Sequence, residues 1–197
     1  MRNSTRGEVD PFIVMDVMEA ARAAEAAGRH IIHMEVGQPG TAAPAAARAS
    51  LAQAMEAGPL GYTVALGLPE LRARIAQLYL EWYGLTLDPA RVVVTPGSSG
   101  AFILAFSALF DAGQRVGIGA PGYPSYRQIL KALDLQPVML ETQAENRLQP
   151  TPADLEGQDL DGLLVASPAN PSGTMLDKGA LAALIHATQA QGAAFIS

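Results

Sequence analysis

Hydrophobic positions recur along the chain with two spacings, and these spacings distinguish predicted helices from predicted strands. Periodic or alanine-rich segments that end at glycine predict helices, whereas short apolar runs predict buried strands. One helical face, over residues 68–84, is expected to pack in a core through Leu71, Ile75, Leu78 and Trp82. Helices are predicted over residues 15–28, 41–58, 68–84, 100–110, 123–134 and 178–192, and strands over residues 31–36, 91–95, 115–119, 136–140, 161–166 and 193–197.

From residue 91 onward the predicted strands and helices alternate, which is typical of an α/β fold with a mainly parallel sheet flanked by helices. Ligands bind such sheets beyond the carboxyl ends of the strands. Three glycine- and proline-containing segments follow strands there: TPGSSG, APGYPSY and ASPANPSGT. We therefore expect a site at this edge. The polar segment LETQAENRLQPTP, residues 140–152, is expected to be a surface loop.

Composition narrows the classes of function. The chain has 197 residues and a net charge of -6, and Lys131 and Lys178 are its only lysines. This acidic balance argues against nucleic acid as a partner. The absence of cysteine excludes thiol chemistry, and the three histidines have no metal-binding spacing. We find no secretory signal and no apolar run long enough to cross a membrane, so a cytoplasmic protein is predicted. Because GAAFIS reads as a buried strand without a polar tail, we expect a fragment.

The PGSSG segment is suited to binding a phosphate. Gly97 lets the backbone approach a ligand, and Ser98 and Ser99 add hydroxyl donors at the start of a helix, where backbone N–H groups lack partners. The segment matches neither GxxxxGK[ST] nor GxGxxG, so it is not a nucleotide P-loop or a dinucleotide fingerprint. A capped helix start without a ligand is the alternative interpretation.

Two further side chains are candidates for binding a planar ligand. Tyr123 lies in a turn restricted by prolines just after a strand, where its ring could stack on a flat group, although packing is the more common role of a single tyrosine. Asn170 lies in a turn restricted by Pro168 and Pro171, so its amide could donate to an oxygen with little ordering cost. A purely structural asparagine is the alternative.

Taken in order, the segments EVGQPG, GYTVALGLPELR, VVVTPGSSGAF, APGYPSY and SPANPSGT resemble the fold-type I pyridoxal-phosphate enzymes of the class I/II aminotransferase family. The resemblance extends over residues 11–197. It implies an N-terminal arm and part of a small domain at residues 1–39, and the first part of a large cofactor-binding domain at residues 40–197. It also implies the cofactor pyridoxal 5'-phosphate and transfer of an amino group between an amino acid and a 2-oxo acid.

The resemblance also assigns roles by position. Residues 97–99 would bind the cofactor phosphate, Tyr123 would stack on the pyridine ring, and Asn170 would hydrogen-bond the ring hydroxyl oxygen. Tyr62 matches the tyrosine that reaches the phosphate of the neighbouring subunit, which implies a homodimer. Gly37 matches the glycine at which the substrate carboxylate binds.

This sequence departs from the family pattern in two ways. Ser167 stands where the turn often has a first asparagine. The Schiff-base lysine, the acid that pairs with the pyridine nitrogen and the substrate-binding arginine would all lie beyond Ser197, while Lys131 and Lys178 read as surface lysines. No catalytic residue is therefore expected within the chain. A lyase or synthase of the same fold and a non-catalytic ligand-binding fragment stay open; a transcription regulator would need a DNA-binding domain ahead of the fold.

Overall fold

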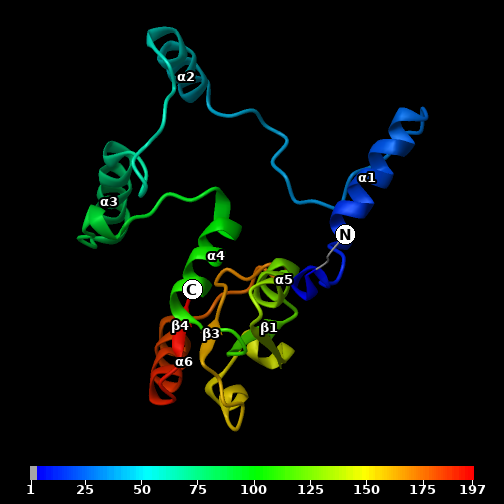
Figure 1. The fold of residues 1–197 in the computed structure, drawn as a ribbon, viewed down its shortest axis with the longest axis vertical. Helices are drawn as coiled ribbons and strands as arrows, with labels where there is room; N and C mark the ends of the chain where they lie inside the picture. The colour runs from blue at the N-terminus through cyan, green and yellow to red at the C-terminus, as the bar shows by residue number, and fades with distance from the viewer. Residues whose placement is uncertain (1–3) are drawn as a thin grey trace. The chain divides into compact units, whose positions relative to one another are not determined.

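The computed structural model describes residues 4–197 and contains the helices and strands drawn in Figure 1. Its contacts divide the chain into two units. One unit contains Gly97–Ser197 together with the N-terminal residues up to Ile13, and the other is Val14–Pro96. The helices are α1 (Ile13–Ala26), α2 (Ala45–Ala57), α3 (Pro69–Tyr83), α4 (Gly97–Leu109), α5 (Pro124–Ala132) and α6 (Lys178–Ala190), with 3-10 turns η1 (Thr5–Gly7), η2 (Pro89–Arg91), η3 (Ala144–Asn146) and η4 (Pro152–Leu155). The strands are β1 (Arg115–Ala120), β2 (Gln136–Glu141), β3 (Gly162–Leu164) and β4 (Ala194–Ile196).

The four strands form one parallel sheet in the order β2-β1-β3-β4. Val116 lies beside Pro137 of β2 on one side and Gly162 of β3 on the other. The mainly parallel α/β fold predicted from the sequence is therefore confirmed. The predicted strands over residues 115–119, 136–140, 161–166 and 193–197 and the six predicted helices all form, with bounds that differ by a few residues.

Side chains alternate between the two faces of the sheet and produce two apolar clusters. On one face Val116, Ile118 and Leu164 pack with Phe106 of α4 and Leu130 of α5. On the other face Leu163 packs with a second group, to which α6 and η4 contribute: Leu140, Leu155, Leu160, Val165 and Leu184. Since neighbouring residues of β3 enter opposite clusters, the short strand is buried on both sides, as its unbroken apolar sequence predicts.

The Val14–Pro96 unit consists of α1, α2, α3 and the segments that join them. Its best-defined turn ends at Gly67, which has a φ of +97° and lies against Val94. The Val94 N–H donates to the Leu66 carbonyl at 3.0 Å, and the Arg72 guanidinium donates to the Val92 carbonyl at 2.9 Å. These contacts tie the start of α3 to the segment that follows it.

Several predictions for this unit are wrong. The predicted strands over residues 31–36 and 91–95 do not form: neither segment is paired with a strand among residues 4–197, and Arg91 belongs to the 3-10 turn η2. Leu71 and Trp82, expected in a core, are exposed. The helix predicted from residue 41 begins at Ala45, with Pro44 as its N-cap, because proline fixes the backbone angle that a helix start needs and has no N–H to leave unpaired.

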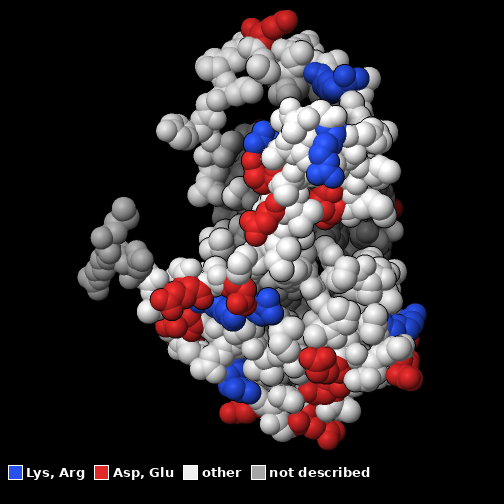
Figure 2. Space-filling view, turned by 90° about the vertical axis from the view of Figure 1, so that its right-hand side faces the viewer, with Lys and Arg blue, Asp and Glu red and all other residues white. Residues whose placement is uncertain are grey.

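Charged side chains of both signs are interspersed on the face shown in Figure 2. One group joins the N-terminal segment to α5: the Lys131 ammonium lies 3.0 Å from the Asp10 carboxylate, and the Arg127 guanidinium lies 3.6 Å from the same oxygen. These cations hold the pKa of Asp10 below its usual value, with the Lys131 hydrogen bond as the main cause. Among the helices formed by residues 4–197, none is long and apolar enough to cross a membrane.

Candidate functional site

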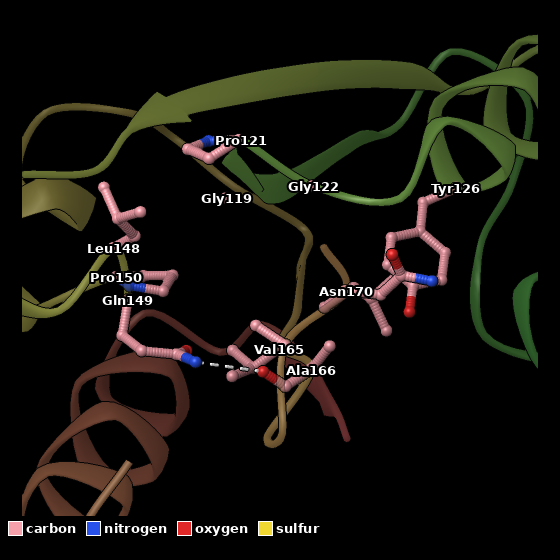
Figure 3. Close-up of a pocket in the computed structure, with 12 residues that line it drawn as sticks. Gly119, Pro121, Gly122, Tyr126, Leu148, Gln149, Pro150, Val165, Ala166 and Asn170 are labelled. Carbon is pink, nitrogen blue, oxygen red and sulfur yellow. Dashed lines mark hydrogen bonds between the residues drawn. The ribbon is translucent and has the colours of Figure 1, made fainter. Parts of the chain in front are cut away.

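The candidate site lies where the chain connections of the sheet change direction. From β1 the chain crosses to β2 on one side, and from β3 it crosses to β4 on the other. The carboxyl ends of β1 and β3 therefore border a topological switch point, which is where open α/β sheets bind ligands. A hollow at this point is lined by residues from the ends of both strands, including Gly119, Gly122, Val165 and Asn170 (Figure 3).

The segment after β1 is held in place before it reaches Tyr123. The Ala120 carbonyl accepts hydrogen bonds from the Thr142 N–H at 3.0 Å and the Thr142 hydroxyl at 2.7 Å. A Cβ at Gly122 would lie 2.4 Å from the Gly119 carbonyl oxygen, so only glycine fits there without moving the backbone. These contacts hold the turn between β1 and α5 in one backbone conformation.

Tyr123 is the N-cap residue of α5 and belongs to a row of aromatic rings. Its ring meets Phe12 edge-on at 6.0 Å and Tyr126 edge-on at 5.5 Å. The faces of its ring are therefore not stacked on either of these two neighbours, and the half-buried side chain is fixed from two sides. Such a ring can receive a planar ligand on its face.

Asn170 lies in an exposed turn after β3 that is closed by its own hydrogen bonds. The Ala169 N–H donates to the Thr174 carbonyl at 2.9 Å, and the Gly173 N–H donates to the Ala169 carbonyl at 2.7 Å. At the start of the turn, the Ser167 hydroxyl accepts from the Leu176 N–H at 3.0 Å. The serine that departs from the family pattern therefore closes this turn.

Asn170 and Tyr123 come to the same edge of the sheet. Asn170 lines the first hollow, and Tyr123 lines a neighbouring one of about 110 Å³. Both hollows are lined by Gly119, Gly122 and Tyr126. Tyr123 and Asn170 therefore border neighbouring hollows that have these three residues in common.

The PGSSG segment differs from its prediction, because α4 begins at Gly97 and not near residue 100. Ser98 and Ser99 lie in the exposed first turn of the helix, where backbone N–H groups point out of its end. Residues 97–99 do not line the hollow that contains Asn170. The same end of α4 does pack against α5, because the Phe102 and Tyr126 rings lie edge-on with their centres 5.0 Å apart.

The other predicted residues lie elsewhere. Gly37 and Tyr62 belong to the Val14–Pro96 unit, and both are exposed. Lys131, predicted to be a surface lysine, is partly exposed on α5, and its ammonium is paired with Asp10. Lys178 is the exposed first residue of α6. None of these four residues lines the hollow at the switch point.

Three residues of the site were not identified from the sequence. Tyr126 lines both hollows, and burial raises the pKa of its phenol, with a smaller effect from Tyr123. The pattern YPSY, with tyrosines three positions apart at a helix start, could have indicated a second ring beside Tyr123. Thr142 and Gln149 are buried, although residues 140–152 were expected to be a surface loop. The sequence of residues 140–152 gives no sign of this burial, because its many polar residues are typical of an exposed loop.

The residue types of these three segments suit a flat, phosphorylated ring, although residues 97–99 line neither hollow. A fixed aromatic side chain can cover one face, a turn amide can reach an edge, and a helix start with two serines favours an anion. The residue types fit pyridoxal 5'-phosphate, which combines an aromatic ring, a ring hydroxyl and a phosphate. Among residues 4–197 no group of His, Asp or Glu side chains is placed to bind a metal.

Comparison with known proteins gives consistent results. The family model described as aminotransferase class I and II matches residues 29–197. Among curated proteins, valine–pyruvate aminotransferase of Mycobacterium tuberculosis is 46% identical over 185 residues, which cover 93% of this chain and 48% of that protein.

Solved structures agree. A protein from Silicibacter pomeroyi is 68% identical with a TM-score of 0.89, covering 99% of this chain and 50% of the other. An aminotransferase from Mycobacterium tuberculosis is 44% identical with a TM-score of 0.93, covering 99% and 51%. The chain thus spans about half the length of the relatives it matches.

Proposed function

Because the chain belongs to the class I and II aminotransferases, which are pyridoxal-phosphate enzymes, we propose that it forms the cofactor-binding part of an enzyme that transfers an amino group between an amino acid and a 2-oxo acid. The observation that carries the proposal is the hollow at the β1–β3 switch point, with Asn170 in its lining and Tyr123 beside it. The domain assignment, residues 1–39 before residues 40–197, is part of the same proposal.

In this proposal each residue acts on the cofactor by binding and orienting it. The first turn of α4, with Ser98 and Ser99, binds the phosphate. Tyr123 stacks on the ring, and the Asn170 amide donates to its hydroxyl oxygen. When bound, the cofactor supplies an electron-withdrawing ring that stabilises negative charge on the substrate carbon. The residues of this chain fix the plane of that ring, and none of them is assigned a proton-transfer role.

The substrates of the proposed reaction are an apolar amino acid and a small 2-oxo acid. The support is the similarity to valine–pyruvate aminotransferase. In balanced form, valine gives its amino group to pyruvate, which yields alanine and the 2-oxo acid with the valine side chain. Gly37 would receive the substrate carboxylate.

We further propose that the enzyme is a cytoplasmic homodimer with a biosynthetic role. The support for the dimer is Tyr62, whose side chain is fully exposed and matches the family tyrosine that reaches the cofactor phosphate of a neighbouring subunit. In a dimer, this ring would enter the site of the other copy.

Cofactor binding and activity can be tested separately. In the intact protein that carries this chain, Asn170→Ala and Tyr123→Ala should each weaken binding of pyridoxine 5'-phosphate about three- to tenfold, from loss of a hydrogen bond or of ring stacking. This ligand lacks the aldehyde, so it cannot react with Lys131 or Lys178. Thr188→Val, which alters a buried hydroxyl of α6, is the control. Unchanged affinity in both variants would remove the assigned roles, and absence of alanine formation from valine and pyruvate would remove the substrate assignment.

A further inference from the structure

One buried amide connects the two ends of the turn that contains Asn170. Gln149 is only 3% exposed, and its Nε2 donates to the Thr174 carbonyl at 2.9 Å and to the Ala166 carbonyl at 3.2 Å. Ala166 lies two residues after β3, and Thr174 lies at the far end of the turn. Figure 3 shows Gln149 across the hollow from Tyr126 and Asn170, with the bond to Ala166 drawn.

The internal bonds of the turn fix its shape but not its place on the sheet. The Ala169 N–H bond to Thr174, the Gly173 N–H bond to Ala169, and the 2.8 Å contact between the Ser172 and Thr174 hydroxyls all join residues of the turn to each other. Gln149, in contrast, comes from a different segment and bonds both ends. The Thr174 carbonyl accepts from both Ala169 and Gln149, so the internal bonds and the external anchor meet at one atom.

The segment that carries Gln149 is itself held against the sheet. Its first buried residue, Thr142, bonds the Ala120 carbonyl at the end of β1. Arg147 and Leu148, just before Gln149, have φ values of 56° and 54°, a left-handed backbone that costs about 1 kcal/mol or more for each such residue. A turn this costly persists only where surrounding contacts require it. Here it brings the chain from the exposed η3 turn back to the interior at Gln149.

We propose that Gln149 is a positioning residue: through the Ala166 and Thr174 carbonyls, it sets where Asn170 lies relative to the end of β1. Thr142 holds the turn that leads to Tyr123 in a similar way, by donating to the Ala120 carbonyl. The segment between them, residues 142–149, thereby fixes the spacing between the two ligand-binding turns. This inference rests on the proposed function for the role of Asn170, but the position of the turn can be measured without any ligand.

The first test measures amide hydrogen exchange in the 197-residue chain. Gln149→Met keeps the length of the side chain but removes the amide donor, so the Ala166 carbonyl loses this hydrogen bond and the Thr174 carbonyl keeps only the one from the Ala169 N–H. Exchange of the Ala169 and Gly173 amides should then rise about tenfold or more, the factor expected for the loss of one or two hydrogen bonds. The Ile118 amide of β1 reports whether the sheet is still folded.

The matched control makes the same chemical change elsewhere. The Gln191 amide donates to the Leu155 carbonyl at 3.1 Å, away from the hollow. Gln191→Met should leave exchange at Ala169 and Gly173 within about twofold of the parent chain, since the turn keeps its anchor. Equal exchange in the two variants, or no change in the Gln149 variant, would overturn the proposal.

A second variant covers the case in which Gln149→Met fails to fold. Gln149→Glu places a carboxylate oxygen against the two carbonyls at neutral pH, but the protonated carboxyl group can again donate one hydrogen bond. Protection of the Ala169 amide, corrected for intrinsic exchange, should fall at neutral pH and partly recover in acid. A flat pH profile would contradict positioning by donation.

Ligand affinity separates this inference from the proposed function. Binding of pyridoxine 5'-phosphate by the parent protein tests the proposed function alone. If it binds, Gln149→Met should weaken binding about three- to tenfold with Gln191→Met unaffected, because a displaced Asn170 loses its hydrogen bond. If the parent protein does not bind, the proposed function fails while the exchange experiment still decides the role of Gln149.

Discussion

Both units of the chain contain hydrophobic segments, but large apolar side chains are buried in the sheet-containing unit and largely exposed in the Val14–Pro96 unit. Around the sheet, large side chains such as Phe106 and Leu163 are completely buried. In the Val14–Pro96 unit, Trp82 is 67% exposed and Met34 is 88% exposed, although both are large apolar side chains. A hydrophobic pattern therefore predicts which face of an element seeks burial; whether burial occurs depends on partners that the pattern does not contain.

The largest effect expected from this comparison concerns single aromatic side chains. Phe106→Ala should lower the free energy of unfolding by about 3–5 kcal/mol, because it leaves a cavity between α4 and the sheet. Trp82→Ala removes a larger ring, yet it should change that free energy by no more than about 0.5 kcal/mol. Urea denaturation of both variants checks the comparison, and a Trp82 variant as unstable as the Phe106 variant would show that the second unit has a core.

A smaller effect on stability is expected at the Gly67 turn of the Val14–Pro96 unit. Gly67 needs a left-handed backbone, and a Cβ there would lie 2.5 Å from the Val94 side chain. Gly67→Ala should therefore cost about 2–4 kcal/mol, measured by thermal or urea denaturation. Gly61→Ala is the matched control, since an added Cβ meets nothing within 4 Å. If the two variants are equally stable, the contact between the Gly67 turn and Val94 does not form in solution.

The sequence predicted the helices, four of the strands and the edge of the sheet that carries Tyr123 and Asn170, because short-range periodicity and turn residues are local properties. The apolar runs at residues 31–36 and 91–95 predict strands for the same local reasons, but a strand also needs a neighbouring strand, which can come from anywhere in a chain. Gln149 could not be found because its two acceptors lie 17 and 25 residues away. Hydrogen bonds from a buried polar side chain to carbonyls that are distant in the sequence leave no periodic pattern in that sequence.

The smallest effect concerns an ion pair of the less buried unit. The His33 imidazole lies 2.6 Å from the Glu35 carboxylate and 2.9 Å from that of Glu25, which raises its pKa from 6.5 to about 9, mainly through the Glu35 hydrogen bond. A raised pKa means that this contact stabilises the fold fully below pH 6.5 and is lost as the pH rises through about 9.

NMR titration of the His33 ring tests this pair. Glu35→Gln should move the His33 pKa back toward 6.5, because the main cause of the shift is removed. Glu81→Gln, which alters a carboxylate bonded to Arg74 at 3.1 Å, should leave the His33 titration unchanged. A parent His33 that already titrates at the ordinary value would show that the three side chains do not meet.

The central claim is that the sheet-containing unit binds a flat phosphorylated ring at the β1–β3 switch point. The most direct measurement is an amide NMR titration of the chain with pyridoxine 5'-phosphate. We expect shifts concentrated at residues 97–99, at Gly122 and Tyr123, and at Ala169 and Asn170, with little change along α6. Shifts confined to other surfaces, or spread evenly over the chain, would contradict it.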